Sequence, residues 1–333
     1  MNRTLFFELI LGVSLLGVCA ILAKVSAPFI PGANNLLIAV IIGITIANTT
    51  GVPSVARPGV QTHKLWLATG IVLMGASLTV ESILARGILV LAIVLSVTTF
   101  TIFYVEFLSR VVFGFSEKLS SLLAVGSSIC GVSAVVAVAG SIRASEEDIA
   151  YAAATVLLFD AVTLFIYPIV GNIFAIPSKI FGMWAGVSMF STGPVIAVGF
   201  MHSAKAGEWA TITKLARNAL IGVVAVAYAA YYTRKRTNAS QSQIRILWAE
   251  FPKFILGFIA FMFIASAGFL STNQISSLVN VYNWLFLLAF VGLGTEIRFS
   301  ELRSTGISPA LVVLIGLSTV SVFSLLLLFF LFG

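Results

Sequence analysis

Two short clusters of small polar residues interrupt the apolar stretches of this sequence. The first is GSSICGVSAVVAV, from Gly126, and the second is GVSMFSTGPVIAV, from Gly186. Gly126 matches Gly186, Ser128 matches Ser188, and both segments end in V-x-A-V. Glycine weakens a helix, and Pro194 in the second cluster removes a backbone donor. The clusters therefore indicate either two helix breaks that bind something polar, or small residues that let another helix approach closely.

Three ionisable residues also fall inside apolar stretches. Asp160 lies in VLLFDAVTLFIYP, and Lys214 and Arg217 share a helix face in EWATITKLARNALIGVV. An ionisable group at the centre of a bilayer costs at least ~2.5–3.5 kcal/mol, which makes a functional role the default hypothesis. The structural alternatives are an Asp160 satisfied by Thr155 or Thr163 and a Lys214 that anchors its helix at the membrane interface.

Together these residues predict a site for an oxyanion. A helix N-terminus carries about half a positive charge and offers free N–H donors, and a guanidinium matches planar or tetrahedral oxyanions. Asp160 is the predicted coupling residue, as a carrier of a proton or a sodium ion or as a counter-charge when the anion is absent. The predicted substrate-binding residues are Ser127, Ser128, Cys130, Gly131, Ser133, Ser188, Ser191, Thr192, Gly193, Lys214 and Arg217.

The composition places these residues in a polytopic membrane protein. Hydrophobic residues make up 59% of the 333 and charged residues only 9%, whereas a soluble domain has about 25% charged residues. We expect a single all-helical transmembrane domain over 1–333, with about eleven spans. They fall at 6–24, 34–50, 64–83, 87–111, 119–141, 147–171, 178–201, 208–232, 252–270, 276–295 and 307–332.

The basic residues predict the orientation of the chain. With a cytoplasmic N-terminus and an external C-terminus, thirteen of the 19 lysines and arginines fall inside, several of them in a basic loop at 233–251. Only Lys24, Arg86, Arg143 and Lys205 fall outside, which satisfies the positive-inside rule. The net charge of +7 is scattered over short loops, so it does not indicate nucleic-acid binding.

Internal similarity predicts inverted repeats, with candidate units at 64–171 and 178–332. MGASLTVESILARGI, from Met74, resembles LGTEIRFSELRSTGI, from Leu293, and their spans cross in opposite senses. The two Gly-Ser clusters fall in the fifth and seventh spans, which run in the same sense. An inverted pair of broken helices would therefore require one of these spans to be re-entrant, or a different span count.

Several segments resemble the YeiH-type sulfate exporter family of prokaryotic inner-membrane proteins. They are LWLATGIVLMGASLT, GSSICGVSAVVAVAGSIRASEEDIAYAAATVLLF, GMWAGVSM and ATITKLARNAL, and the resemblance runs in order from about Asn34 to Gly306. It implies a secondary transporter in the cell membrane, distantly similar to the cation–proton antiporter and bile-acid transporter superfamily, whose members use crossed broken helices and elevator-like alternating access. Elevator-type transporters are often dimers, so a homodimer is expected by analogy.

The chain departs from that family pattern near its second cluster. After the WAGxS motif the family usually has a His-Glu pair and a Gln, whereas this chain has Phe190, Ser191 and Pro194. Asp160 stands where the family more often has a small residue, which suggests a relocated carboxylate.

The expected function is transport of a small anion, sulfate or an organosulfonate, by alternating access. The alternative is a proton- or sodium-coupled cation antiporter, and a channel is a third reading. No motif for an intramembrane metalloprotease or a P-loop ATPase is present, so we expect no enzymatic activity and no cofactor. His63 and His202 have no ligand-spaced partner, so no metal site is predicted.

Overall fold

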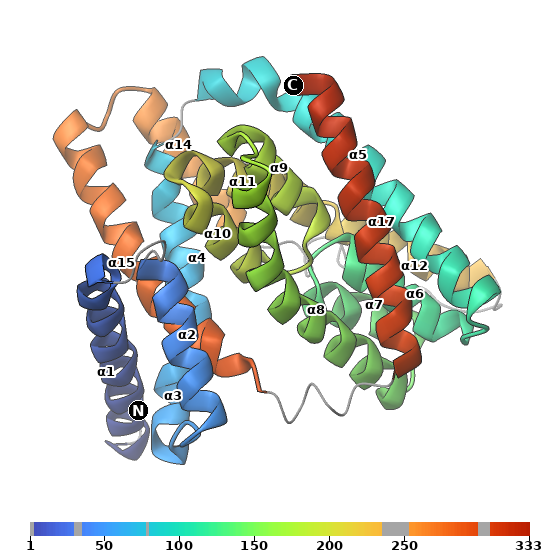
Figure 1. Cartoon of the computed structure of the whole chain (residues 1–333), viewed down its shortest axis with the longest axis horizontal. Helices are drawn as coiled ribbons and strands as arrows, with labels where there is room; N and C mark the ends of the chain where they lie inside the picture. Colours follow the sequence, from blue (N-terminus) through green and yellow to red (C-terminus); the bar gives the residue numbers. More distant parts are fainter. Residues whose placement is uncertain (1–2, 30–34, 78–79, 235–252, 299–306) are drawn as a thin grey trace. The chain divides into compact units, whose positions relative to one another are not determined.

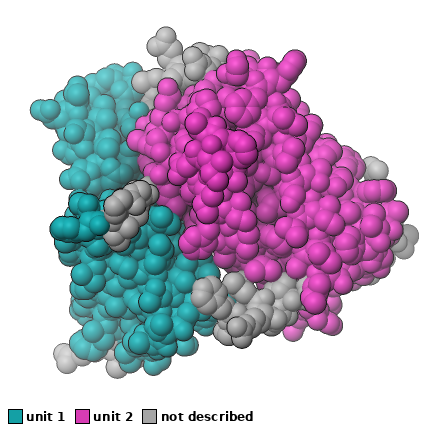
Figure 2. Space-filling view, viewed as in Figure 1, with its two compact units in different colours: residues 1–87, 253–299 teal, residues 88–252, 300–333 magenta. Residues whose placement is uncertain are grey.

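The computed structural model describes residues 3–29, 35–77, 80–234, 253–298 and 307–333, and these residues form helices and connecting loops without a strand (Figure 1). The chain divides into two compact units (Figure 2). The first comprises residues 1–87 and 253–299, and the second residues 88–252 and 300–333. The repeat units expected at 64–171 and 178–332 cut across this division and stay a prediction.

The first unit is held together by close helix contacts at glycines. Gly43 of α2 and Gly294 of α15 bring two backbones together: a Cβ atom on Gly43 would lie 2.1 Å from the carbonyl oxygen of Val291. Lys64 of α4 pairs with Glu296 at the end of α15, at 2.9 Å. The helices of this unit are α1 (Arg3–Ser26), α2 (Asn35–Asn48), α3 (Arg57–Val60), α4 (His63–Met74), α14 (Phe254–Ser266) and α15 (Thr272–Glu296).

The second unit contains both Gly-Ser clusters and all the predicted site residues. Most of α5 (Val80–Phe107) belongs to it, and a π-helical turn (Leu108–Val112) continues that helix. The other helices are α6 (Glu117–Ser128), α7 (Val132–Ile142), α8 (Glu146–Ile173), α9 (Ser178–Ser188), α10 (Thr192–His202), α11 (Ala204–Asn218), α12 (Ile221–Arg234) and α17 (Ile307–Phe332).

Among the residues that the structure describes, six helical segments are long and apolar enough to cross a membrane. They are Leu5–Phe29, Gly87–Val112, Glu146–Ile173, Ala204–Tyr232, Thr272–Glu296 and Ile307–Phe332. The predicted spans at 34–50 and 252–270 correspond to the shorter apolar helices α2 and α14, and that at 64–83 begins with the 12-residue α4. The predicted basic loop 233–251 lies outside the described residues after Arg234.

The first Gly-Ser cluster is the tip of a helical hairpin, here called hairpin 1 (residues 117–142). The side chain of Lys118, at the start of α6, donates to the carbonyl oxygen of Arg143, just after α7, at 2.5 Å. Halfway along, a Cβ atom on Gly126 would lie 2.9 Å from the side chain of Val135. The two helices therefore run antiparallel, and both ends of the hairpin lie together.

The second cluster forms hairpin 2 (residues 178–202) in the same way. Ser203, just after α10, donates to Ser178 at the start of α9, at 2.9 Å. Gly182 of α9 and Gly199 of α10 both face the same turn of α11, around Ala206. In Figure 1, α9, α10 and α11 accordingly lie side by side.

Both 119–141 and 178–201 therefore fold back on themselves, which is the re-entrant arrangement that the sequence left open for one of these two spans. At 1.5 Å per residue, the half-helices of 11 or 12 residues are ~17 Å long, about half of a ~30 Å hydrocarbon core. A stretch of more than 20 apolar residues is long enough for either arrangement, so length alone could not distinguish them.

The 28-residue helix α8 separates the open ends of the hairpins. Hairpin 1 ends just before the start of α8, and hairpin 2 begins just after its end. The helix is ~42 Å long, so the hairpins approach from opposite ends of α8. Asp160 lies at its middle, and Ser191 in the tip of hairpin 2 hydrogen-bonds to it.

Local sequence explains where these helices begin. Ser116, Ser145 and Ser203 cap α6, α8 and α11, each accepting a backbone N–H with its side chain. Gly131 starts α7 at φ 72° and ψ −135°, a conformation reserved for glycine. Pro194 lies in the first turn of α10, where its missing N–H leaves no intrahelical bond unmade.

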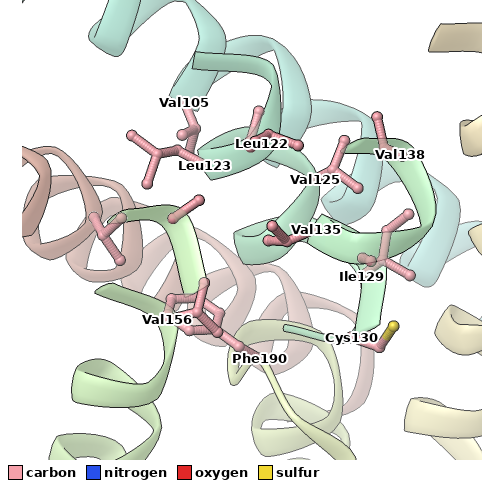
Figure 3. Packing of buried hydrophobic residues seen from close by; sticks show 14 of the residues in the cluster. Val105, Leu122, Leu123, Val125, Ile129, Cys130, Val135, Val138, Val156 and Phe190 are labelled. Atoms are coloured by element: carbon pink, nitrogen blue, oxygen red, sulfur yellow. The ribbon is translucent and has the colours of Figure 1, made fainter. Parts of the chain in front are cut away.

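Hairpin 1 is fixed by an apolar core. Val125, Ile129 and Val135 of the hairpin pack with Val156 of α8 and with Phe190 of hairpin 2 (Figure 3). All five are buried. This core holds the hairpin tips firmly enough to position the polar groups beside them.

Candidate functional site

The tips of both hairpins are held by two cations from α11. Lys214 is fully buried, and its ammonium group donates to the carbonyl oxygens of Ile129, at 2.6 Å, Met189, at 3.1 Å, and Phe190. These carbonyls follow the last turns of α6 and α9. An ammonium has three N–H donors, so all of them are used on main-chain acceptors.

Arg217 repeats this pattern one turn further along α11. It is 1% exposed and donates from Nε to the carbonyl of Ser128, from Nη2 to that of Ser127 at 2.5 Å, and from Nη1 to that of Met189 at 2.7 Å. The negative ends of the α6 and α9 dipoles therefore both face a cation. Without these donors, the last carbonyls of two helices would be buried without a partner.

Asp160 caps the other helix of hairpin 2. It is 5% exposed, and its Oδ1 accepts the backbone N–H of Ser191 at 3.0 Å, at the start of α10. Neither of the two threonines considered as its partners hydrogen-bonds to its carboxylate. Thr163 donates to the backbone carbonyl of Asp160, and Thr155 donates to that of Tyr151. A carboxylate at a helix N-terminus is favoured by the helix dipole.

The two tips touch at Gly131 and Ser191. A Cβ atom on Gly131 would lie 2.3 Å from the Ser191 hydroxyl oxygen, so only glycine fits there. In the described part of the chain, four polar atoms from elements that meet at the tips are buried without a hydrogen-bond partner. They are Ser127 Oγ, Asp160 Oδ2, Thr213 Oγ1 and Asn218 Oδ1. Unsatisfied buried polar groups are uncommon in folded proteins, so these four atoms are the part of the candidate site that the protein does not itself satisfy.

The other predicted residues divide between structural and available groups. Ser188 is buried, donates to the carbonyl of Trp184 and accepts from Tyr167, at 2.9 Å. Thr192 is half-buried and accepts from Asn218 at 2.9 Å, whereas Ser133 on α7 is exposed. Cys130 and Gly193 are buried. Ser188 therefore fixes hairpin 2, whereas Ser133 and Thr192 are accessible.

Sequence reasoning missed two residues of this region. Tyr167 lies seven residues after Asp160, on the same face of α8, and links hairpin 2 to Ser321 of α17 at 3.1 Å. Thr213 immediately precedes Lys214 and packs against Gly186. The periodicity of α8 was a usable signal for Tyr167. Nothing in the sequence singles out Thr213, because its partner comes from another helix.

No group of three or more metal-ligating His, Cys, Asp or Glu residues lies together in the described ranges. The three charged side chains at the tips carry a formal charge of +1. Each hairpin tip adds the negative end of one helix dipole and the positive end of another, which nearly cancel. The region is thus a buried, weakly positive cluster at the meeting point of two hairpins.

These features define the class: an all-helical, multi-pass membrane protein. The family model described as "Conserved hypothetical protein 698" matches residues 9–313. The chain is 33% identical over 280 residues to a "UPF0324 membrane protein" of Nitratidesulfovibrio vulgaris, covering 83% of this chain and 78% of that one. A namesake from Bacillus cereus is 31% identical over 322 residues, covering 96% and 90%.

The chain therefore belongs to the UPF0324 membrane protein family. A longer relative from N. vulgaris is 32% identical, and this chain spans 48% of its length. No solved structure gives a significant match. The relatives' names state that they are membrane proteins and name no substrate.

Proposed function

We propose that this protein is a secondary transporter of a small anion, sulfate or an organosulfonate, which binds where the two hairpin tips meet. The observation that carries the proposal is the buried cluster formed by Lys214 and Arg217 of α11 and by Asp160, which lies midway along α8. Such charges are expensive at this depth, and half-helix ends at the bilayer midplane are a recurrent device of transporters.

The cations act in this proposal through their charge and by holding the tips. Their N–H donors are bound to main-chain carbonyls, so direct contacts to the anion come from other groups once the site opens. Ser133 and Thr192, which are accessible at the starts of α7 and α10, are suited to that role. The net charge of +1 favours a bound anion over a bound cation.

Two hairpins that enter the membrane from opposite sides would also give the two Gly-Ser clusters the opposite orientations that an inverted repeat requires. In this scheme hairpin 1 opens to the cytoplasm and hairpin 2 to the outside. Arg143 then joins Lys118 on the inside, and Lys179 joins Lys205 on the outside. The number of basic residues on each side stays the same as in the eleven-span scheme, and the N-in, C-out orientation is retained. Alternating access would move the hairpins as a body, as elevator-type transporters do.

The second candidate is a proton- or sodium-coupled cation antiporter. It is favoured by Asp160 Oδ2 and Asn218 Oδ1, two buried acceptors without partners at the start of α10. In an anion transporter the same acceptors would serve the coupling ion. The two functions therefore share the site, and they differ in whether an anion is transported together with the coupling ion.

Solute counterflow in proteoliposomes tests the proposal. Vesicles are loaded in turn with sulfate, thiosulfate, taurine or a simple carboxylate, and uptake of the same labelled compound is followed. Saturable uptake of one anion supports the anion transporter. No anion uptake, together with proton flux driven by a sodium gradient that is lost in Asp160→Asn, would replace it with the antiporter.

A further inference from the structure

A second site lies away from the hairpin tips, between α5 and α12. A cavity of about 310 Å³ is lined by Phe103, Glu106 and Arg110 on one side and by Ala227, Tyr228 and Tyr231 on the other. It opens sideways, because Phe103 is 70% exposed and Tyr231 is 44% exposed. All of these residues belong to the second unit.

The polar end of the cavity is a connected network. Glu106 pairs with Arg110 at 2.5 Å and accepts the hydroxyls of Tyr228 and Ser121, both at 2.8 Å. Arg110 also donates to Ser121 at 3.0 Å, yet its side chain stays 23% exposed. The carboxylate is thus satisfied from within, and the guanidinium, which also donates to the carbonyl oxygen of Glu117 at 3.3 Å, remains partly exposed at the cavity.

The cavity is oriented as a lipid molecule would require. Arg110 and Tyr231 lie within two residues of the ends of the apolar segments Gly87–Val112 and Ala204–Tyr232. Phe103 and Ala227 lie about one to two turns deeper along their helices. Tyrosine and arginine at the ends of spans mark the membrane–water interface, and apolar walls mark the hydrocarbon.

The charge around the polar end specifies the kind of lipid. Arg110 donates to the carbonyl oxygen of Glu117 at 3.3 Å, and the next residue, Lys118, donates to the carbonyl oxygen of Arg143 at 2.5 Å. Three basic residues, Arg110, Lys118 and Arg143, therefore lie near this end, against the two acidic residues Glu106 and Glu117. Basic pockets between helices on the cytoplasmic side bind anionic lipid headgroups. We propose that the α5–α12 cavity binds an anionic phospholipid, with one acyl chain against Phe103 and Ala227 and the phosphate beside Arg110 and Tyr231.

Native mass spectrometry of the full-length protein, exchanged into mixed micelles of phosphatidylglycerol and phosphatidylcholine, tests this. We expect one tightly held phosphatidylglycerol, bound in preference to phosphatidylcholine. Ala227→Phe fills the apolar end and should weaken this binding by about tenfold or more, which corresponds to ~1.4 kcal/mol. Val223→Phe is the matched control, because Val223 lies one turn earlier on the same helix and is 60% exposed.

Tyr231→Phe keeps the cavity walls and removes one hydroxyl, so it should reduce the preference for phosphatidylglycerol even if Ala227→Phe does not fold. Equal binding of both lipids by the wild type would overturn the proposal. So would unchanged phosphatidylglycerol binding by a folded Ala227→Phe protein, or an unchanged preference in Tyr231→Phe.

Discussion

Hairpin 1 and hairpin 2 both have buried helix ends at their tips, but they differ in how these ends are stabilised. Both end their first helix among buried carbonyls, and in both Lys214 and Arg217 bind those carbonyls. They differ in how the second helix begins. Hairpin 1 turns at Gly131 in a conformation that only glycine adopts, whereas hairpin 2 turns through extended residues and places Asp160 against the start of α10. The shared part is structural, and the carboxylate gives hairpin 2 an ionisable group of its own.

Arg217→Ala should break both hairpins at once and have the largest effect. It removes the donors to the buried carbonyls of Ser127 and Ser128, whereas the carbonyl of Met189 keeps Lys214, and each unsatisfied group costs about 1–3 kcal/mol. We expect a large fall in the melting temperature of the detergent-purified protein, measured by fluorescence-detected gel filtration. Arg217→Lys keeps a cation and should lose less. A melting temperature equal to that of the wild type in Arg217→Ala would contradict the shared role.

Gly131→Ala should break hairpin 1 alone. The substitution forces alanine to φ 72° and ψ −135°, which costs about 1–3 kcal/mol, and places its Cβ 2.3 Å from the Ser191 hydroxyl. We expect a lower melting temperature and loss of counterflow. Gly140→Ala on α7 is the control, because a Cβ atom there meets nothing within 4 Å and alanine favours the helix by about 0.5–1 kcal/mol. Equal stability of the two variants would contradict the tip geometry.

Asp160→Asn should act on hairpin 2 with little loss of stability. The asparagine Oδ1 can still accept the N–H of Ser191, but the negative charge is gone. We expect folded protein whose transport no longer depends on pH or on sodium, measured by counterflow across a pH series with and without sodium. Transport with an unchanged dependence on both would show that Asp160 is not the coupling residue.

Surface labelling should sharpen the comparison by reporting on which side of the membrane each hairpin has its open end. In a background of Cys19→Ala and Cys130→Ala, single cysteines at Arg143 and Lys205 are treated with a membrane-impermeant maleimide in spheroplasts. We expect Lys205→Cys to react from outside and Arg143→Cys to react only after permeabilisation. The eleven-span scheme places both outside, so reaction of both in intact spheroplasts would restore it.

The sequence singles out residues that the structure brings together at the hairpin tips, but it does not reveal how the chain folds back there. Asp160, Lys214 and Arg217 stand out because ionisable residues are costly in apolar stretches, and the two Gly-Ser clusters stand out because they interrupt helices. The six long apolar segments were also predictable from length and hydropathy. Whether 119–141 crosses or folds back depends on pairs such as Lys118 with Arg143, which hydropathy does not report.

The binding partners of the cations were not predictable for a related reason. Main-chain carbonyls carry no sequence signature, so a lysine directed at an anion and a lysine bound to Ile129 and Phe190 look the same in one chain. Gly131 was noticed as part of a cluster, but neither its positive φ nor its close approach to Ser191 can be read from the sequence. Such contacts join residues 24 to 85 positions apart in the sequence.

Lys214 and Arg217 are synthesised well after the hairpin 1 carbonyls that they bind. The carbonyls of Ser127 and Ile129 are bound by side chains 90 and 85 residues further along the chain. At about 5–20 residues per second, hairpin 1 emerges roughly 4–17 s before α11 can reach it. During that interval its tip must stay hydrated or shielded by the insertion machinery, so α11 completes the membrane assembly of both hairpins in a single late step.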